Sequence, residues 1–302
     1  MGCVDNADRL AANPKISVVV ISRNEGQELE ATIGCFLETL PADCRELIVV
    51  DDGSMDGSAA FLNNLPEVRL LHSDGIGVAR ARNFGANAAT GDVVLFSDAH
   101  VRAPKGWHVP IVDALRSDSV GAVAPGIYSL TEPGRRGFGL HLTGPDLRTE
   151  WQKRPGNDPC PVSILPGCFL AMRRETFLRT GGFDPGMRQL GGNDNEISFR
   201  FWSLGYELLI VPEIEVGHLF RTSTPYEAQW AALVHNRLRM AFVHFDQGRV
   251  ERVLDALRAY NAFPAAMAMM LDARDVFIRR EEFTATRRFD DAWYFEKFAL
   301  NC

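Results

Sequence analysis

Apolar runs separated by short polar turns dominate the first hundred residues. Residues 16–22 form an almost continuous β-branched run, and residues 47–50 form a second, both typical of strands buried on two faces of a sheet. Apolar residues between these runs recur at the spacing of one helical face: Leu29, Ile33, Phe36, Leu37 and Leu40. The pattern continues with a short helix, a strand at 68–71, a helix at 77–89 and a strand at 93–96. Alternating strands and helices predict an α/β fold with a doubly wound sheet.

The remaining two thirds divide into a loop-rich part and a helical part. Residues 129–160 are rich in Gly, Pro and charge, and we expect a long loop over the sheet that could serve as an acceptor-side lid. A strand is predicted to open at 166–169, and a helix to cover 194–204. From Glu227 onward the chain is predicted to be amphipathic helix, interrupted at Gly248 and Pro264. The predicted units are a tail at 1–15, a catalytic domain at 16–226 and a helical C-terminal extension at 227–302.

Polar residues follow three of the predicted strands. Asn24, Asp52 and Asp98 each come at or just after a strand's carboxyl end, where ligands bind in open α/β sheets. In Asp51-Asp52-Gly53-Ser54, Asp52 is the better candidate to accept a hydrogen bond from a uracil or adenine edge. The alternative is a plain strand-to-helix turn, since Asp, Gly and Ser favour turns for local reasons.

A second group of residues has the chemistry of a metal-diphosphate site. Asp98 and His100 alternate at the end of one apolar run, and His218 ends another. One carboxylate and two imidazoles suit Mn²⁺ or a similar divalent ion, with positions left open for phosphate oxygens. Arg221 and Tyr226 add a fork of donors and a phenolic hydroxyl, which a diphosphate requires. The alternatives are an Asp N-cap with an exposed histidine at position 100, and a satisfied core histidine at position 218.

Two helix starts carry further candidates. The segment 77–83 begins a helix whose N-terminus can face an anion, and it contains Arg80 and Arg82. Arginines two positions apart do not share a helical face, so at most one reaches a ligand, and Arg80 is taken as the candidate. At the second start, residues 191–196, the candidates are Asn193, Asp194 and Glu196. A carboxylate there holds sugar hydroxyls or deprotonates an acceptor, and plain capping is the alternative.

Bulk composition narrows the class of protein. A chain of 302 residues with 46% apolar residues suits a folded α/β protein. The net charge of −7 disfavours nucleic acid as the main partner. Six cysteines without a CxxC pair argue against a disulfide scaffold or a zinc cluster and suit free thiols. No segment has the features of a signal peptide or a transmembrane helix, so a cytoplasmic location is expected.

Together these motifs resemble the GT-A-fold glycosyltransferases of family 2 and, more specifically, the family 27-like catalytic domain of polypeptide N-acetylgalactosaminyltransferases. The most specific pieces are Ser198-Phe199-Arg200 and the segment 216–226, with 77–100 matching equally well. The resemblance implies a GT-A fold in which Asp98, His100 and His218 hold Mn²⁺ bridging the diphosphate of a UDP-sugar donor.

Further roles follow from the same resemblance. Asp52 would lie near uracil, Arg23 and Glu25 beside the nucleotide, and Arg221 and Tyr226 on a mobile loop that closes over UDP. The sugar, a hexose or N-acetylhexosamine, would pass with retention to a hydroxyl of a peptide, a glycan or a small metabolite. The family's lectin domain, membrane anchor and stem have no counterpart in the sequence, which leads us to expect a free-standing, bacterial-style unit.

Several departures from the family pattern leave alternatives open. The family's Trp-Gly-Gly-Glu-Asn is replaced by residues 190–194, so that Leu190 stands for the Trp and Asn193 for the Glu. Gly75 replaces an expected Arg. Asp194 stands where inverting family-2 enzymes carry their base, so an inverting transferase is one alternative. A non-catalytic protein that binds UDP-sugars or glycans is the other.

Overall fold

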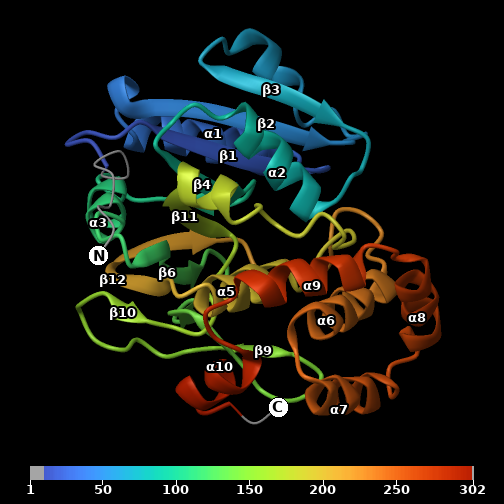
Figure 1. Ribbon diagram of the computed structural model, residues 1–302. Helices are drawn as coiled ribbons and strands as arrows, with labels where there is room; N and C mark the ends of the chain where they lie inside the picture. Colours follow the sequence, from blue (N-terminus) through green and yellow to red (C-terminus); the bar gives the residue numbers. More distant parts are fainter. Residues whose placement is uncertain (1–9, 301–302) are drawn as a thin grey trace.

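The computed structural model describes residues 10–300, so most of the predicted tail lies outside the described residues, as do Cys3 and Cys302. Within this range the main sheet has ten strands, in the order β10-β12-β6-β11-β4-β1-β2-β3, with β5 paired to β12 and β7 to β6 (Figure 1). A separate two-stranded sheet consists of β8 and β9. The strands are β1 (Ile16–Ser22), β2 (Arg45–Asp52), β3 (Val68–Ser73), β4 (Val93–Asp98), β5 (Val101–Arg102), β6 (Val120–Ser129), β7 (Arg136–Gly137), β8 (Leu140–Leu142), β9 (Thr149–Trp151), β10 (Cys160–Pro161), β11 (Phe169–Arg173) and β12 (Glu207–His218).

Helices cover both faces of the sheet, as the doubly wound prediction requires. They are α1 (Gln27–Thr39), α2 (Val78–Ala88), α3 (His108–Ala114), α4 (Arg174–Arg179), α5 (Asn193–Ser203), α6 (Trp230–His244), α7 (Gln247–Leu257), α8 (Phe263–Asp272), α9 (Val276–Thr286) and α10 (Asp291–Lys297), with 3₁₀ turns at Ala42–Cys44 and Ala60–Asn64. Side chains along β1 alternate between two cores, with Val18 and Val20 in one and Val19 in the other. The strand is therefore buried on both faces, as its unbroken apolar run indicates.

The sheet is mixed. The first half is parallel, with β1 between β2 and β4, but β11 runs antiparallel to both β4 and β6. The predicted loop at 129–160 is wrong in detail, because the short strands β7 to β10 lie on or within it. Such strands of two or three residues leave no period-2 pattern in the sequence. The short helix expected after β2 is a 3₁₀ helix.

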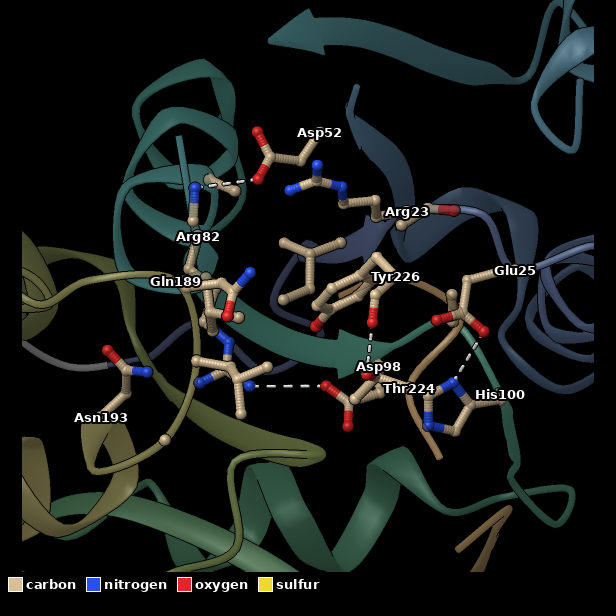
Figure 2. A pocket seen from close by; sticks show the side chains of 18 of the residues that line it. Arg23, Glu25, Asp52, Arg82, Asp98, His100, Gln189, Asn193, Thr224 and Tyr226 are labelled. Carbon is tan, nitrogen blue, oxygen red and sulfur yellow. Dashed lines mark hydrogen bonds and ion pairs between the residues drawn. The ribbon is translucent and has the colours of Figure 1, made fainter. Parts of the chain in front are cut away.

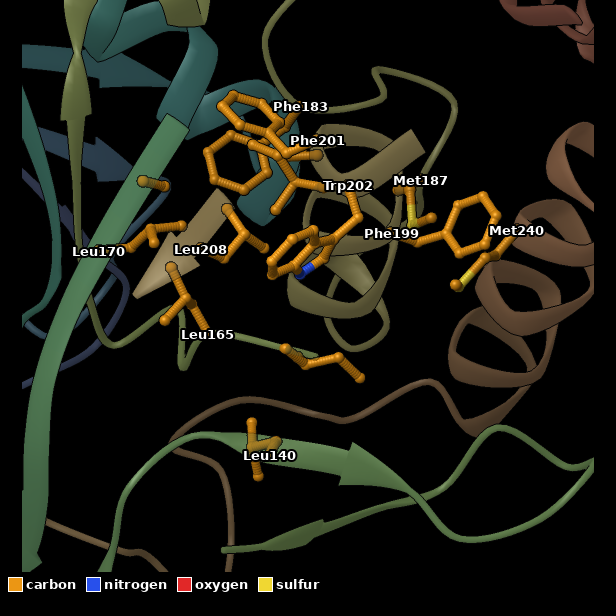
Figure 3. Close-up of a cluster of buried hydrophobic side chains, with 14 of the residues drawn as sticks. Leu140, Leu165, Leu170, Phe183, Met187, Phe199, Phe201, Trp202, Leu208 and Met240 are labelled. Carbon is orange, nitrogen blue, oxygen red and sulfur yellow. The ribbon is translucent and has the colours of Figure 1, made fainter. Parts of the chain in front are cut away.

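The C-terminal helices share a core with the sheet. Phe199 of α5 and Met240 of α6 belong to one buried cluster, together with Leu208 of β12 (Figure 3). The expected interruption at Gly248 lies earlier, since α6 ends at His244 and Asp246 caps α7 by accepting a hydrogen bond from the Arg249 amide. Pro264 stands in the first turn of α8, where proline is tolerated. In Figure 1 these helices gather on the opposite side of the molecule from β3.

Candidate active site

The carboxyl ends of β1, β2 and β4 open into a cavity of about 250 Å³, shown in Figure 2. Tyr226 lies in its middle, between Arg23 and Asp98. The predicted site residues that line it are Arg23, Glu25, Asp52, Asp98, His100, Asn193, Asp194 and Tyr226. Arg80, Glu196, His218 and Arg221 do not line it, although His218 and Arg221 each contact a residue that does.

The three predicted metal ligands converge. One ligand atom from each of Asp98, His100 and His218 lies within 4.8 Å of the others. The reason is a strand pairing: β5 pairs antiparallel with the end of β12, which places His218 opposite Val101. The His100 carbonyl accepts a hydrogen bond from the Leu219 amide at 3.1 Å. Two segments about 120 residues apart are thus joined at the point where the imidazoles meet.

The electrostatics of the triad favour a bound cation. Burial raises the pKa of Asp98, but the hydrogen bond from His218 and the charges of His100 and Arg82 outweigh burial and hold that pKa well below its ordinary value. Burial lowers the pKa of His100, yet the hydrogen bond to Glu25, at 3.0 Å, and the charge of Asp98 raise it overall. Asp98 is therefore a carboxylate at neutral pH, and Glu25 orients the imidazole beside it.

The donor set fits a divalent transition ion. The Nδ1 atom of His218 is buried and has no hydrogen-bond partner among the described residues, which is unusual for a buried polar atom. The two imidazole nitrogens suit a divalent transition ion, and the carboxylate oxygen is a ligand type that also suits Mn²⁺. The residues present would therefore hold such an ion between β4 and β12.

The segment after β12 lies against the cavity. Arg221 donates to the Glu25 carboxylate at 2.6 Å, and the Arg23 guanidinium lies 5.1 Å from the Tyr226 ring centre. Gln189 contacts the C-terminal end of this segment: its side chain donates a hydrogen bond to the Glu227 carbonyl at 2.9 Å and accepts one from the Gln229 amide at 2.7 Å. No sequence signal pointed to Gln189.

Asp52 shapes the end of the cavity that the sequence predicts to receive the nucleotide. Its carboxylate accepts hydrogen bonds from the Ser73 hydroxyl at 2.7 Å and from the Ile76 and Gly77 amides at 2.7 and 2.9 Å. The neighbouring Asp51 accepts from the Ser54 amide, as a turn residue does. Asp52 thus fixes the turn before α2 and still faces the cavity, so its contact with a nucleobase stays a prediction.

Of the two arginines on α2, it is Arg82 that lines the cavity, whereas Arg80, the predicted nucleotide-binding residue, does not. Arg80 is exposed and donates to the Pro185 carbonyl. Arg82 is buried, and it lies 3.5 Å from Asp98 and 3.2 Å from Asp194. Ala79 and Ala86, three residues before Arg82 and four after it, are also buried. That row of small residues on one helical face was the signal that distinguishes the two.

Asp194 and Asn193 face the cavity from the start of α5. Asp194 accepts from Arg82 and, at 3.0 Å, from the Gly167 amide. A Cβ at position 167 would lie 2.0 Å from the Asp194 carboxylate, so only glycine allows this approach. The Oδ1 atom of Asn193 is buried without a partner among the described residues, and it can accept a hydrogen bond from a ligand.

Glu196 lies elsewhere, and its assignment as a catalytic residue is corrected. It is 1% exposed and accepts from Arg200 at 2.7 Å and from His244 at 3.0 Å, beneath α5. The first turn of a helix points its residues in different directions, so Asp194 faces the cavity while Glu196, two positions on, faces the core. His235 and His244 of α6 are core residues, whereas Trp230 at the start of that helix is 69% exposed.

Comparison with known proteins places these features among glycosyltransferases. Residues 17–180 match the family described as glycosyl transferase family 2, and residues 158–224 match the N-terminal domain of galactosyltransferase. The chain is 34% identical over 259 residues to polypeptide N-acetylgalactosaminyltransferase 11 of Xenopus tropicalis, covering 78% of this chain and 43% of the relative. It is 31% identical over 256 residues to polypeptide N-acetylgalactosaminyltransferase 10 of Mus musculus, covering 78% and 42%. The chain thus spans less than half the length of these relatives.

Two solved structures share the fold. One is a crystal structure of GalNAc-T7 with UDP, GalNAc and Mn²⁺, with a TM-score of 0.76, 21% identity, and coverage of 95% of this chain and 57% of the other. The second is the mannosyltransferase PcManGT from Pyrobaculum calidifontis in complex with GDP-Man and Mn²⁺, with a TM-score of 0.54, 20% identity, and coverage of 96% and 84%. The predicted GT-A fold with C-terminal helices is confirmed. Across residues 10–300, none of the helices has the length and apolar character needed to cross a membrane.

Proposed function

The chain belongs to glycosyl transferase family 2, and on that premise we propose that it is a metal-dependent glycosyltransferase that moves a sugar from a UDP-sugar to a hydroxyl acceptor. The observation that carries the proposal is the convergence of Asp98, His100 and His218 beside a cavity at the strand ends. Similarity to polypeptide N-acetylgalactosaminyltransferases supports UDP as the nucleotide. Mn²⁺ or a similar ion, when bound, supplies positive charge where the leaving diphosphate develops negative charge.

Each residue of the cavity has a proposed task. Asp98, His100 and His218 hold the ion, and Glu25 orients His100 through the hydrogen bond at 3.0 Å. Asp52 and Arg23 bind the nucleoside, while Tyr226 covers it. Arg221, which is paired with Glu25 at 2.6 Å, has a guanidinium fork suited to the diphosphate.

The residues at the start of α5 are proposed to contact the donor sugar. Asn193 presents an unpartnered Oδ1 that can accept from a sugar hydroxyl. We propose transfer with retention, because both oxygens of Asp194 are already engaged, one by Arg82 and one by the Gly167 amide. An inverting route with Asp194 as base is the second candidate, and the observation that favours it is the 34% exposed carboxylate at the cavity. The anomeric configuration of the product decides between the two.

The test of the donor site is calorimetry with UDP, first with Mn²⁺ and then with EDTA. We expect binding that depends on the metal, and His218→Ala to weaken it by about 100-fold or more, since loss of an outer partner alone costs about 10–100-fold. His72→Ala is the matched control, because His72 is 70% exposed on β3. Equal UDP affinity with Mn²⁺ and with EDTA would refute the metal site.

A further inference from the structure

A second cavity of about 530 Å³ adjoins the nucleotide end of the first. The two share Arg23 and Gln189 in their walls. Arg80 and Arg188 also line the second cavity, so three guanidinium groups from separate parts of the chain face one space. The proposed transfer reaction uses Arg23 to bind the nucleoside but assigns no task to this second cavity.

The three guanidinium groups make few hydrogen bonds and no ion pairs to the residues that the structure describes. Arg23 and Arg188 donate no side-chain hydrogen bond to a described residue, and Arg80 donates only its Nε, to the Pro185 carbonyl. Asp74 and Glu227 also line the cavity, but within residues 10–300 neither forms an ion pair with these arginines. Between them the guanidinium Nη atoms therefore have many free N–H donors.

Arg23 is held in place by packing alone. Its Nη1 lies 3.3 Å from where a Cβ on Gly75 would stand, and its Cζ lies 5.1 Å from the centre of the Tyr226 ring. The Nε atom is buried without a partner among the described residues. A guanidinium fixed between backbone and ring, with unsatisfied donors, loses little entropy on binding an oxyanion.

We propose that this cavity binds a tetrahedral oxyanion, the phosphate group of a small molecule, across Arg23, Arg80 and Arg188. Guanidinium forks match the oxygens of phosphate in geometry and charge. The volume leaves room for an organic group attached to the phosphate. This site is separate from the one proposed for the diphosphate of the donor, which lies beside Asp98 at the other end of the first cavity.

The experiment is a sulfate titration followed by NMR shifts of backbone amides, with ionic strength held constant by chloride. One arm contains EDTA, and the other contains saturating UDP with Mg²⁺. We expect saturable shifts at residues 75–76 and 188–189 in both arms. Arg80→Ala and Arg188→Ala should each weaken the binding about tenfold, because a charge-assisted hydrogen bond is lost. Arg258→Ala, which removes a 64% exposed arginine at the end of α7, should leave it unchanged.

Two outcomes would overturn the proposal. The first is a sulfate response that disappears when UDP is bound, since the anion would then have occupied the position of a UDP phosphate. The second is a response that does not saturate or that is equal in all variants. If UDP itself fails to bind, the EDTA arm still tests this site alone. Glycerol 1-phosphate, run alongside, distinguishes the two sources: equal or tighter binding than sulfate assigns a phosphomonoester, and weaker binding assigns a free oxyanion.

Discussion

Replacing Glu196 by Gln separates a structural carboxylate from a catalytic one. The side chains of Glu196, Arg200 and His244 are 1%, 4% and 0% exposed, and the carboxylate accepts from both partners. Arg200 also donates to the carbonyls of Thr180 and Gly182. Glu196 and Arg200 therefore connect α5 to α6, through His244, and to the loop after α4. In Glu196→Gln the amide oxygen remains as an acceptor, but the charge that offsets Arg200 is lost.

The expected cost is about 3 kcal/mol, the lower end of the range of about 3–5 kcal/mol for breaking a buried ion pair from one side. This corresponds to a fall in Tm of about 5–10 °C. Burial raises the pKa of Glu196, but the charge of Arg200 and the hydrogen bond from His244 hold it below its ordinary value overall. The carboxylate therefore stabilises the fold above about pH 4.3, and this contribution is lost as pH falls through the lower folded pKa. The Gln variant should lack that part of the acid dependence.

The assay pairs calorimetric unfolding with UDP-sugar turnover measured well below the Tm. We expect Glu196→Gln to retain turnover within about twofold, since the residue does not line the cavity. Asp194→Asn is the matched variant, and its free energy of unfolding should stay within about 1 kcal/mol of wild type. A loss of turnover of about 100-fold or more in Asp194→Asn would identify a base. An unchanged Tm with lost turnover in Glu196→Gln would refute the structural assignment.

Three further predictions concern His244, His100 and Arg82. Burial lowers the pKa of His244 in the folded state, so the unfolded state takes up the proton first as the pH drops below about 6.5. The free energy of unfolding should therefore fall below that pH, and urea titrations from pH 5 to 8 on wild type and His244→Gln test this. The pKa of His100 is raised, and the imidazole must lose its proton to hold a metal, so UDP affinity with Mn²⁺ should fall as the pH drops through that raised pKa. Calorimetry in two buffers should detect the proton release, and an affinity that does not change with pH would contradict the prediction. Arg82→Lys should lower turnover by about tenfold or more, because a lysine ammonium cannot contact both Asp98 and Asp194 as the guanidinium group of Arg82 does. Arg80→Lys should not lower turnover, and equal effects of the two variants in a donor-saturation assay would contradict the prediction.

Much of the first half of the fold could be predicted because its strands are buried on both faces. A continuous apolar run such as β1 is typical of a strand inside a covered parallel sheet, and the polar residue at its end then marks the ligand edge. The metal triad was also predictable, since Asp98 and His218 each end a strand. What joins them is the β5–β12 pairing, and a strand of two residues leaves no pattern in the sequence.

The sequence did not show which of two nearby helical residues faces the cavity. Arg80 and Arg82, like Asp194 and Glu196, differ by two positions on a helix, and propensity does not say which faces the cavity. The answer lies in tertiary packing: Arg82 shares its face with buried alanines, and Glu196 meets an arginine and a histidine. Only the alanine row was visible in the sequence.

The C-terminal helices do not line the cavity, but α6 holds the elements that do. His244 of α6 reaches Glu196, which lies in the same turn of α5 as Asn193 and Asp194, and Arg239 of α6, fully buried, pairs with Asp184 and Asp275. The loop from 184 to 192 leads directly into α5, so α6 fixes both ends of the segment that we propose to face the sugar. Cutting the chain after residue 226 would take His244 from Glu196, which keeps Arg200, and would leave Asp184 buried without Arg239, at a cost of several kcal/mol. We therefore predict that the division at 226 separates sequence regions but not folding units, and that a fragment of 1–226 does not unfold cooperatively in a calorimeter.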